Sequence, residues 1–312
     1  MCCRSMCQHG TVKVRVGYGL GVRTQLNDSK FLDVVDTMEK LRFDSLWLSE
    51  RLGGEAPDPL VAMSMAAART TKLKFGMSVM VLPGRNPIVL AKELATLDRM
   101  SNGRLLPAFG LGVADPQEQQ AFGVERSQRA KMFNEALAVV RSCWMDESVT
   151  FHGDYFNYDN LRVQPKPLQQ PPEVWLGGIA ESELKRVGRL ADGWLPSFVT
   201  PQDAASGWAA ITHVASEHHR EIDPEHFGVL IPYSIGEAPP QVLAGLKARR
   251  PDLDDISVIV PQGWKQLAHT IEQFVNVGAS KFVVIPLIEP GSVNEWNDHL
   301  AEAATHLLPL QN

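Results

Sequence analysis

Two short glycine-rich stretches have the residue types and spacing that best suit ligand chemistry. Gly110-Leu111-Gly112 and Gly177-Gly178-Ile179-Ala180 each follow an apolar run that predicts a strand. Glycines let a ligand approach backbone N–H groups closely, and the second stretch precedes a predicted helix, whose amino terminus favours a phosphate. The pattern indicates an anionic or phosphorylated cofactor. The alternative is that these glycines only turn the chain.

Glu50 and Arg51 form an adjacent pair of opposite charges directly after a predicted strand over residues 45–48. Neighbouring side chains at a strand end point in different directions, so one of the two can face a ligand while the other pairs outward. The alternative for such a pair is a structural salt bridge. The sequence contains no Ser-His-Asp order, Cys-His pair or His-Glu-x-x-His motif.

The stretch from Lys72 to Met100 predicts the unit that positions such residues. Apolar residues alternate with others over 73–81 as in a strand, a Pro/Gly-rich turn follows, and a helix begins at Pro87. One side of this helix is broadly apolar, which suits a crossover between parallel strands. If the chain repeats this unit, its chemistry lies at the carboxyl ends of the strands, here around residues 78–85.

Strands and helices alternate along the whole chain. The predicted strands lie near residues 12–20, 45–48, 72–81, 103–112, 171–178, 193–196, 227–234 and 281–286. Because no Gly-x-Gly-x-x-Gly fingerprint follows the first strand, this order predicts an α/β protein with one (β/α)₈ barrel over residues 12–312 rather than a doubly wound sheet. The strand ends would then form one mouth that contains Tyr18, Glu50, Arg51, Ser78, Gly110, Gly112, Gly177, Gly178, Ser197, Tyr233 and Pro286.

Helices are predicted near residues 28–41, 58–69, 87–100, 127–145, 182–190, 203–219, 265–277 and 292–308. Ser182 is expected to cap one of them and Asp203 to open the next. Residues 115–124 are predicted to form a loop, and residues 151–166 a surface hairpin. The segment 236–263, rich in Pro and charge, is predicted to be an insertion beside the seventh helix.

The composition restricts the classes of function. The formal net charge is −6 and no basic run with interleaved aromatic residues occurs, so we expect no binding to nucleic acid. No stretch approaches the ~20 apolar residues of a membrane span, and the amino terminus lacks the apolar core of a signal peptide, which favours a cytoplasmic protein. Residues 1–11 are expected to be a disordered or mis-started leader. Its Cys2, Cys3, Cys7 and His9 match no standard zinc pattern, so no metal site is predicted.

Several segments together resemble the bacterial luciferase-like monooxygenase superfamily and, within it, the actinobacterial group of coenzyme F420-dependent oxidoreductases. These segments are residues 43–51, 58–62, 76–87, 94–104, 164–167, 175–178 and 191–196, and they include Phe43-Asp-Ser-Leu-Trp-Leu-Ser-Glu-Arg51 and Trp175-Leu-Gly-Gly178. The resemblance extends from about Val12 to Leu308. It implies a (β/α)₈ barrel, a flavin or deazaflavin across its mouth, a small-molecule substrate and a homodimer.

The resemblance also implies a set of site residues. A non-proline cis peptide is implied between Ser78 and Val79, behind the central ring of the cofactor, with Glu50 beside that ring. The implied cofactor-binding residues are Glu50, Ser78, Val79, Val81, Leu111, Gly112, Gly177, Gly178, Ile179 and Ala180, of which the last six hold the tail and the phosphate. Glu50 and Arg51 are the catalytic candidates.

Two positions depart from the pattern of the F420-dependent glucose-6-phosphate dehydrogenases. Arg51 stands where those enzymes carry a histidine, and Val113 where they carry a catalytic glutamate, which argues against sugar-phosphate oxidation by their mechanism. Hydride transfer remains possible because the cofactor carries the chemistry while the protein holds the substrate and excludes water. We therefore expect an F420-dependent oxidoreductase; an FMN-dependent monooxygenase and a cofactor-binding barrel without activity are the alternatives.

Overall fold

Short parallel strands form the centre of the molecule. The computed structural model describes residues 13–26 and 28–312. Its central strands are β1 (Arg15–Leu20), β2 (Ser45–Leu48), β3 (Lys74–Met77), β4 (Met80–Val81), β5 (Leu105–Leu106), β6 (Ala108–Gly110), β9 (Trp175–Leu176), β10 (Gly193–Trp194), β11 (Gly228–Tyr233) and β12 (Lys281–Pro286).

The order of these strands is that of a barrel. One sheet has the order β11-β12-β1-β2-β3-β5, and a second has the order β10-β9-β6-β4. β4 follows β3 and β6 follows β5 almost without interruption, so the two sheets share two broken strands. Isolated parallel bridges, Trp194 with Phe227 and Ser197 with Leu230, connect the region of β10 to that of β11. The predicted α/β barrel fold is therefore confirmed.

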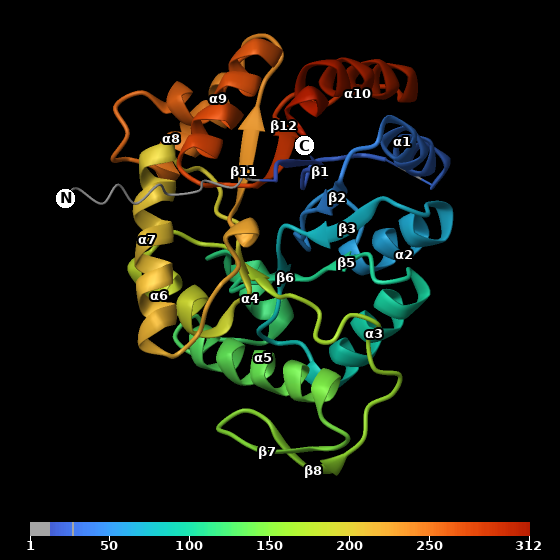
Figure 1. Ribbon diagram of the computed structural model, residues 1–312, viewed down its shortest axis with the longest axis vertical. Helices are drawn as coiled ribbons and strands as arrows, with labels where there is room; N and C mark the ends of the chain where they lie inside the picture. The colour runs from blue at the N-terminus through green and yellow to red at the C-terminus, as the bar shows by residue number, and fades with distance from the viewer. Residues whose placement is uncertain (1–12, 27) are drawn as a thin grey trace, which may run out of the picture.

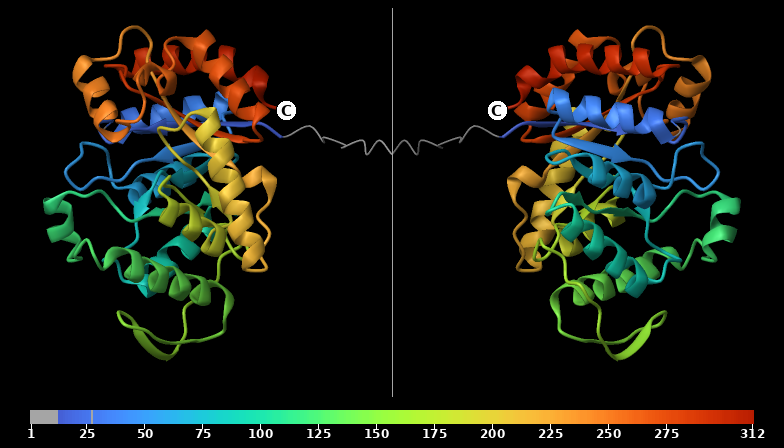
Figure 2. Two further views of the ribbon diagram at one scale, coloured as in Figure 1. Left: turned by 90° about the vertical axis from the view of Figure 1, so that its left-hand side faces the viewer. Right: turned by 90° about the vertical axis from the view of Figure 1, so that its right-hand side faces the viewer.

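The helices lie outside the strands (Figures 1 and 2). They are α1 (Asp28–Leu41), α2 (Pro59–Arg69), α3 (Pro87–Met100), α4 (Pro116–Phe122), α5 (Arg129–Met145), α6 (Glu181–Leu190), α7 (Pro201–Glu217), α8 (Pro240–Arg249), α9 (Trp264–Asn276) and α10 (Val293–Leu307). Short 3₁₀ turns occur at Pro224–His226, Ile256–Ile259 and Leu308–Leu310. The predicted hairpin is present as β7 (Val149–His152) and β8 (Asn157–Leu161), which project from the barrel next to α5 (Figure 1).

Two predicted helix starts were wrong. α6 begins at Glu181, with Ala180 rather than Ser182 at the capping position. α7 begins at Pro201, where the Thr200 side chain accepts from the N–H of Asp203, and Asp203 accepts in return from the N–H of Thr200 at 2.9 Å. Asp203 is thus the third helical residue of a capping box, which the Thr-Pro-x-Asp spacing indicates.

Two segments predicted without helices contain them. Residues 115–124 include α4, which begins with Asp115 as its cap and ends at Gly123, where φ is +64°. Residues 236–263 include α8 and the 3₁₀ turn at Ile256–Ile259. Both helices lie on the carboxyl side of the barrel strands that precede them, and both take part in the site described below.

Tyr18 and Tyr233 do not face the mouth, contrary to the prediction. Strand side chains alternate between faces, and in β1 the inward positions belong to Gly17 and Gly19. A Cβ added at Gly19 would lie 2.3 Å from Cγ1 of Ile285, inside the barrel. Tyr18 therefore points outward, is fully buried under the helices, and its hydroxyl lies 2.6 Å from that of Tyr233.

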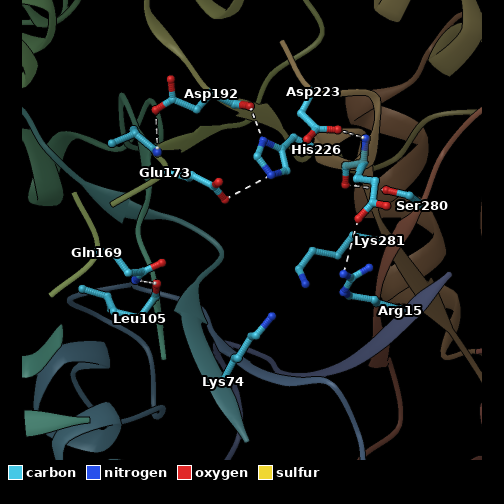
Figure 3. Close-up of polar contacts among 12 residues, drawn as sticks. Arg15, Lys74, Leu105, Gln169, Glu173, Asp192, Asp223, His226, Ser280 and Lys281 are labelled. Carbon is cyan, nitrogen blue, oxygen red and sulfur yellow. Dashed lines mark hydrogen bonds and ion pairs between the residues drawn. The ribbon is translucent and has the colours of Figure 1, made fainter. Parts of the chain in front are cut away.

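Charged side chains gather at the opposite end of the barrel, where the strands begin. Figure 3 shows Arg15, Lys74 and Lys281, which come from β1, β3 and β12. All three approach the carboxylate of Asp44, at 3.7, 3.9 and 2.7 Å, and the side chains of Lys281 and Asp44 are only 6% and 12% exposed. This end of the barrel holds a partly buried ion-pair network, separate from the predicted mouth.

The cysteines of the predicted leader, Cys2, Cys3 and Cys7, and its boundary at residue 11 lie outside the described residues. None of the helices within residues 13–26 and 28–312 combines the length and hydropathy that a membrane crossing needs.

Candidate active site

A cavity of about 640 Å³ opens at the carboxyl ends of the barrel strands. This volume is in the range of small-molecule and cofactor sites. Nine of the predicted site residues line it: Glu50, Arg51, Ser78, Val79, Val81, Leu111, Gly112, Gly177 and Gly178. Gly110, Ser197 and Pro286 line it too, whereas Ile179 and Ala180 do not.

The side chain of Val79 lies beside two glycines, one at the end of β6 and one directly after β9. The peptide between Ser78 and Val79 is cis, as predicted. A Cβ added at Gly110 would lie 2.5 Å from Cγ2 of Val79, and one added at Gly177 would lie 3.9 Å from Cγ1. The N–H of Ser78 donates to the carbonyl of Leu48 at 2.8 Å, which ties this turn to β2. Val79 and the glycines around it thus form one wall of the cavity.

The Glu50 carboxylate is engaged on both oxygens. Oε2 accepts from the N–H of Val81 at 2.7 Å, and Oε1 accepts from the guanidinium of Arg85. Arg85 also donates from Nε to the carbonyl of Val81 at 2.8 Å. Burial raises the pKa of Glu50 above its ordinary value, although the Arg85 charge and the Val81 N–H act in the opposite direction. Glu50 therefore anchors β4 beside the cavity.

Arg51 turns toward α4. Its Nε lies 2.7 Å from Oε1 of Glu118, and its Nη2 lies 3.9 Å from Oδ2 of Asp115. Glu118 is 6% exposed, so α4 holds Arg51 through a nearly buried carboxylate. The sequence carried the signal for α4 in Asp115-Pro116 and Gly123, a start and stop pattern like that of Asp58-Pro59.

The loop after β6 is held from behind by Arg129 of α5. Its Nη1 donates to the carbonyls of Leu111, Gly112 and Val113 at 3.3, 2.9 and 2.8 Å. Burial lowers the pKa of Arg129. With its carbonyls bound to Arg129, the loop is fixed in place where Leu111, Gly112 and Val113 line the cavity.

The start of α6 is capped from within the helix. The N–H groups of Ile179 and Ala180 donate to Oε2 of Glu183 at 3.0 and 3.1 Å. Glu183 and Arg186 both line the cavity. The amides on which a phosphate was predicted therefore already have a carboxylate partner.

Sequence reasoning missed the opposite side of the cavity. Glu289 lies three residues after β12, and Oε1 accepts from the Thr24 hydroxyl at 2.7 Å. Burial raises the pKa of Glu289, opposed by the Thr24 hydrogen bond and the charge of Arg23. A search for titratable residues within three positions of each strand end would have found it. α8 and its neighbourhood contribute Phe198, Gln241, Val242, Gly245, Leu246 and Arg249.

The profile of the luciferase-like monooxygenase family matches residues 17–278. The chain belongs to the luciferase-like monooxygenase family. In this luciferase-like protein the matched range includes nearly all the strands that surround the cavity, and β12 lies just beyond it.

Curated relatives of this luciferase-like protein include enzymes named as F420-dependent. The F420-dependent glucose-6-phosphate dehydrogenase of Kineococcus radiotolerans is 30% identical over 192 residues, which are 58% of this chain and 56% of that protein. The chain thus spans little more than half the length of the curated relatives that it matches.

Two solved structures share its fold. An F420-dependent secondary alcohol dehydrogenase, in complex with an F420-acetone adduct, superposes with a TM-score of 0.79 at 21% identity, over 96% of this chain and 100% of that one. The oxygenating constituent of 3,6-diketocamphane monooxygenase from Pseudomonas putida, in complex with FMN, superposes with a TM-score of 0.78 at 16% identity. The match covers 96% of this chain and 99% of that one. At these identities the likeness shows the fold alone.

The cavity of the luciferase-like protein suits a flat ring system with a polar tail. Gly110, Gly112, Gly177 and Gly178 present backbone rather than side chains to it, and Glu50 and Arg51 are charged groups on its wall. The residues present therefore fit a flavin or deazaflavin, with one exception: Glu183 occupies the amides at the start of α6.

Proposed function

We propose that this protein is an F420-dependent oxidoreductase that transfers a hydride between the deazaflavin and a small organic substrate. The observation that carries the proposal is the cavity in which the Val79 side chain lies beside Gly110 and Gly177, at the carboxyl ends of two neighbouring strands of a luciferase-like barrel. The F420-dependent relatives and the F420-dependent alcohol dehydrogenase of the same fold support the deazaflavin in preference to FMN.

The residues have distinct proposed roles. Ser78, Val79 and Val81 form the wall on which the ring rests, with Glu50 and Arg51 at its polar edge. Leu111 and Gly112, fixed by Arg129, and the segment from Gly177 to Ala180 hold the tail and the phosphate. When bound, F420 supplies the carbon that gives or takes the hydride; the protein orients the substrate and excludes water.

Glu289 is the proposed proton acceptor. Oxidation of an alcohol to a carbonyl releases the hydroxyl proton, and a carboxylate on the cavity wall can take it. Both Glu50 oxygens already accept hydrogen bonds, whereas only Oε1 of Glu289 has a hydrogen-bond partner among the described residues. We expect Glu289→Gln to reduce kcat by roughly 10²- to 10⁴-fold. Steady-state kinetics of F420 reduction will measure this.

The pH profile distinguishes proton transfer from a structural role. A base acts when deprotonated, so the rate of alcohol oxidation should rise with pH through the raised pKa of Glu289. Thr24→Val removes the hydrogen bond that stabilises the carboxylate, so this acidic limb should move to higher pH. An unchanged profile in Thr24→Val, or full activity in Glu289→Gln, would refute the assignment.

The proposal is tested by turnover. Purified protein is incubated without oxygen with F420 and a series of secondary alcohols, and in the reverse direction with reduced F420 and the matching ketones. Loss or gain of the absorbance of oxidised F420 reports hydride transfer. Binding of F420 without turnover of any substrate would favour the alternative of a cofactor-binding barrel without activity.

An FMN-dependent monooxygenase is the second candidate, favoured by the FMN complex of the same fold. Reduced FMN, oxygen and an aldehyde or ketone should then yield an oxygenated product with this protein. Oxygen consumption that depends on both protein and substrate, together with no turnover of F420, would replace the first proposal with this one.

We also propose that the protein forms a homodimer, as the family resemblance implies. α2 and α3, which pack against each other, expose apolar side chains to solvent: Val61 is 61% exposed, Val89 51% and Met100 81%. Analytical ultracentrifugation should give twice the chain mass of 34.5 kDa. A species of single-chain mass at micromolar concentration would contradict the dimer.

A further inference from the structure

The first turn of α6 contains two glutamates that differ in what they bind. Glu183 accepts from the N–H groups of Ile179 and Ala180, the two residues that were predicted to bind the phosphate. Glu181 instead accepts from Lys185, one turn along the helix, and its side chain is 82% exposed. Only the first of these carboxylates occupies the amides at the helix start.

Local chemistry explains why Glu183 has this position. Ala180, at the capping position, has no side-chain oxygen, so it cannot satisfy the free N–H groups as Ser, Thr, Asp or Asn would. Gly178, at φ +92°, leaves space for the Glu183 carboxylate, because a Cβ at this position would lie 2.4 Å from Oε2 of Glu183. The amides, the helix dipole and the space thus favour an anion, and Glu183 supplies one from the chain itself.

Arg186, three residues after Glu183, brings a positive charge to the same cavity. It lines the cavity and is 8% exposed, yet among the described residues its only hydrogen bond runs from Nε to Oδ1 of Asn134, at 3.2 Å. Its guanidinium carbon lies 5.7 Å from the centre of the Phe133 ring. Burial lowers the pKa of Arg186, and the nearby charge of Glu183 opposes this. The terminal N–H groups of Arg186 have no hydrogen-bond partner among the described residues, and a guanidinium is suited to a phosphate.

We infer that Glu183 competes with the cofactor's phosphate for the N–H groups of Ile179 and Ala180, and that Arg186 pairs with the phosphate when Glu183 gives way. Glu183 therefore lowers the affinity for a phosphorylated cofactor and leaves the affinity for the same ring without its phosphate unchanged. This inference rests on the proposed function, because it takes F420 as the ligand.

The test compares F420 with the deazariboflavin that lacks the phosphate and the tail, by fluorescence titration. Glu183→Ala should bind F420 about fivefold more tightly than the unchanged protein, the gain expected when a competing helix cap of ordinary strength is removed. The phosphate-free ring should bind both proteins equally. Glu181→Ala removes the same charge from the same turn but no amide partner, and should change either affinity by less than about twofold.

Two further variants test the inference if Glu183→Ala destabilises α6. Glu183→Gln keeps an acceptor oxygen without the charge and should raise the affinity for F420 by a smaller factor, about twofold. Arg186→Met should lower the affinity for F420 by roughly tenfold and leave the affinity for the phosphate-free ring unchanged.

The outcomes separate this inference from the proposed function. Failure of every protein to bind either deazaflavin would overturn the proposed function itself. Binding of both ligands with no change of their ratio in Glu183→Ala, or an equal gain in Glu181→Ala, would overturn the competition and leave the proposed function standing.

Discussion

Replacing Asp44 by asparagine is expected to lower the free energy of unfolding by about 3 kcal/mol or more, because it leaves a buried lysine without its counter-ion. Lys281, whose side chain is 6% exposed, would lose a partner at 2.7 Å, and Arg15 and Lys74 would lose the carboxylate that they share. Burial already lowers the pKa of Lys281, and Asp44 opposes that effect. Urea unfolding, with the slope m unchanged, will measure the loss.

A surface pair provides the matched control. Asp36 forms a bidentate contact with Arg69, but the two side chains are 39% and 53% exposed. Asp36→Asn should therefore cost less than about 1 kcal/mol. Equal losses in the two variants would show that the network at the amino ends of the strands is no more important than a solvated pair.

The same variant should change the response to acid. Burial alone would raise the pKa of Asp44, but the charges of Lys281 and Lys74 and the hydrogen bonds from Lys281 and Ser45 outweigh it, and the pKa is lowered. The stabilisation is then fully present above the unfolded pKa of about 3.9 and is lost as pH falls through the lower folded value. Asp44→Asn should remove this part of the acid dependence.

Replacing Gly177 by leucine is expected to weaken cofactor binding by roughly a hundredfold, because the new side chain fills space that the ring is proposed to occupy. Gly177 lines the cavity, and its φ is not positive. A Cβ there would lie 3.9 Å from Cγ1 of Val79, an ordinary contact, and 3.3 Å from the carbonyl oxygen of Leu195, which would have to shift by a few tenths of an ångström. Fluorescence titration with F420 will measure the affinity.

Gly53 serves as the control for this substitution. It is exposed, lies outside the cavity, and has no atom within 4 Å of an added Cβ. Gly53→Leu should bind F420 as the unchanged protein does, and both variants should unfold at temperatures within a few degrees of it. Unimpaired F420 binding by Gly177→Leu would mean that the ring lies elsewhere.

The architecture could be predicted because its signals are local. Alternating apolar residues and helix caps predicted the barrel. Helix α2 begins as predicted after Asp58, whose side chain accepts from the N–H of Val61 at 3.0 Å. The predicted orientation of Tyr18 was wrong because the side to which a strand residue points depends on its neighbours in the strand. Gly17 and Gly19 occupy the inward positions, so Tyr18 points outward. Helix α4 was predicted as a loop, although the sequence contains its capping residue, Asp115, and the glycine that ends it, Gly123.

The site was predicted in part for the same reason. Val79, Glu50 and the glycines lie at strand ends, where position in the chain implies position in space. Glu183 and Arg186 could not be assigned, because the role of Glu183 depends on a side chain folding back four residues to the N–H of Ile179. Glu289 comes from the last strand and meets Thr24 from the first loop, a contact between residues 265 positions apart that only the folded barrel creates.

Calorimetric titration of the purified protein with F420 and, separately, with FMN tests the central claim most directly. The proposed function predicts one F420 bound per chain, with an affinity at least tenfold higher than that for FMN. Tighter binding of FMN, or no heat of binding with F420 at concentrations up to about 100 μM, would contradict it.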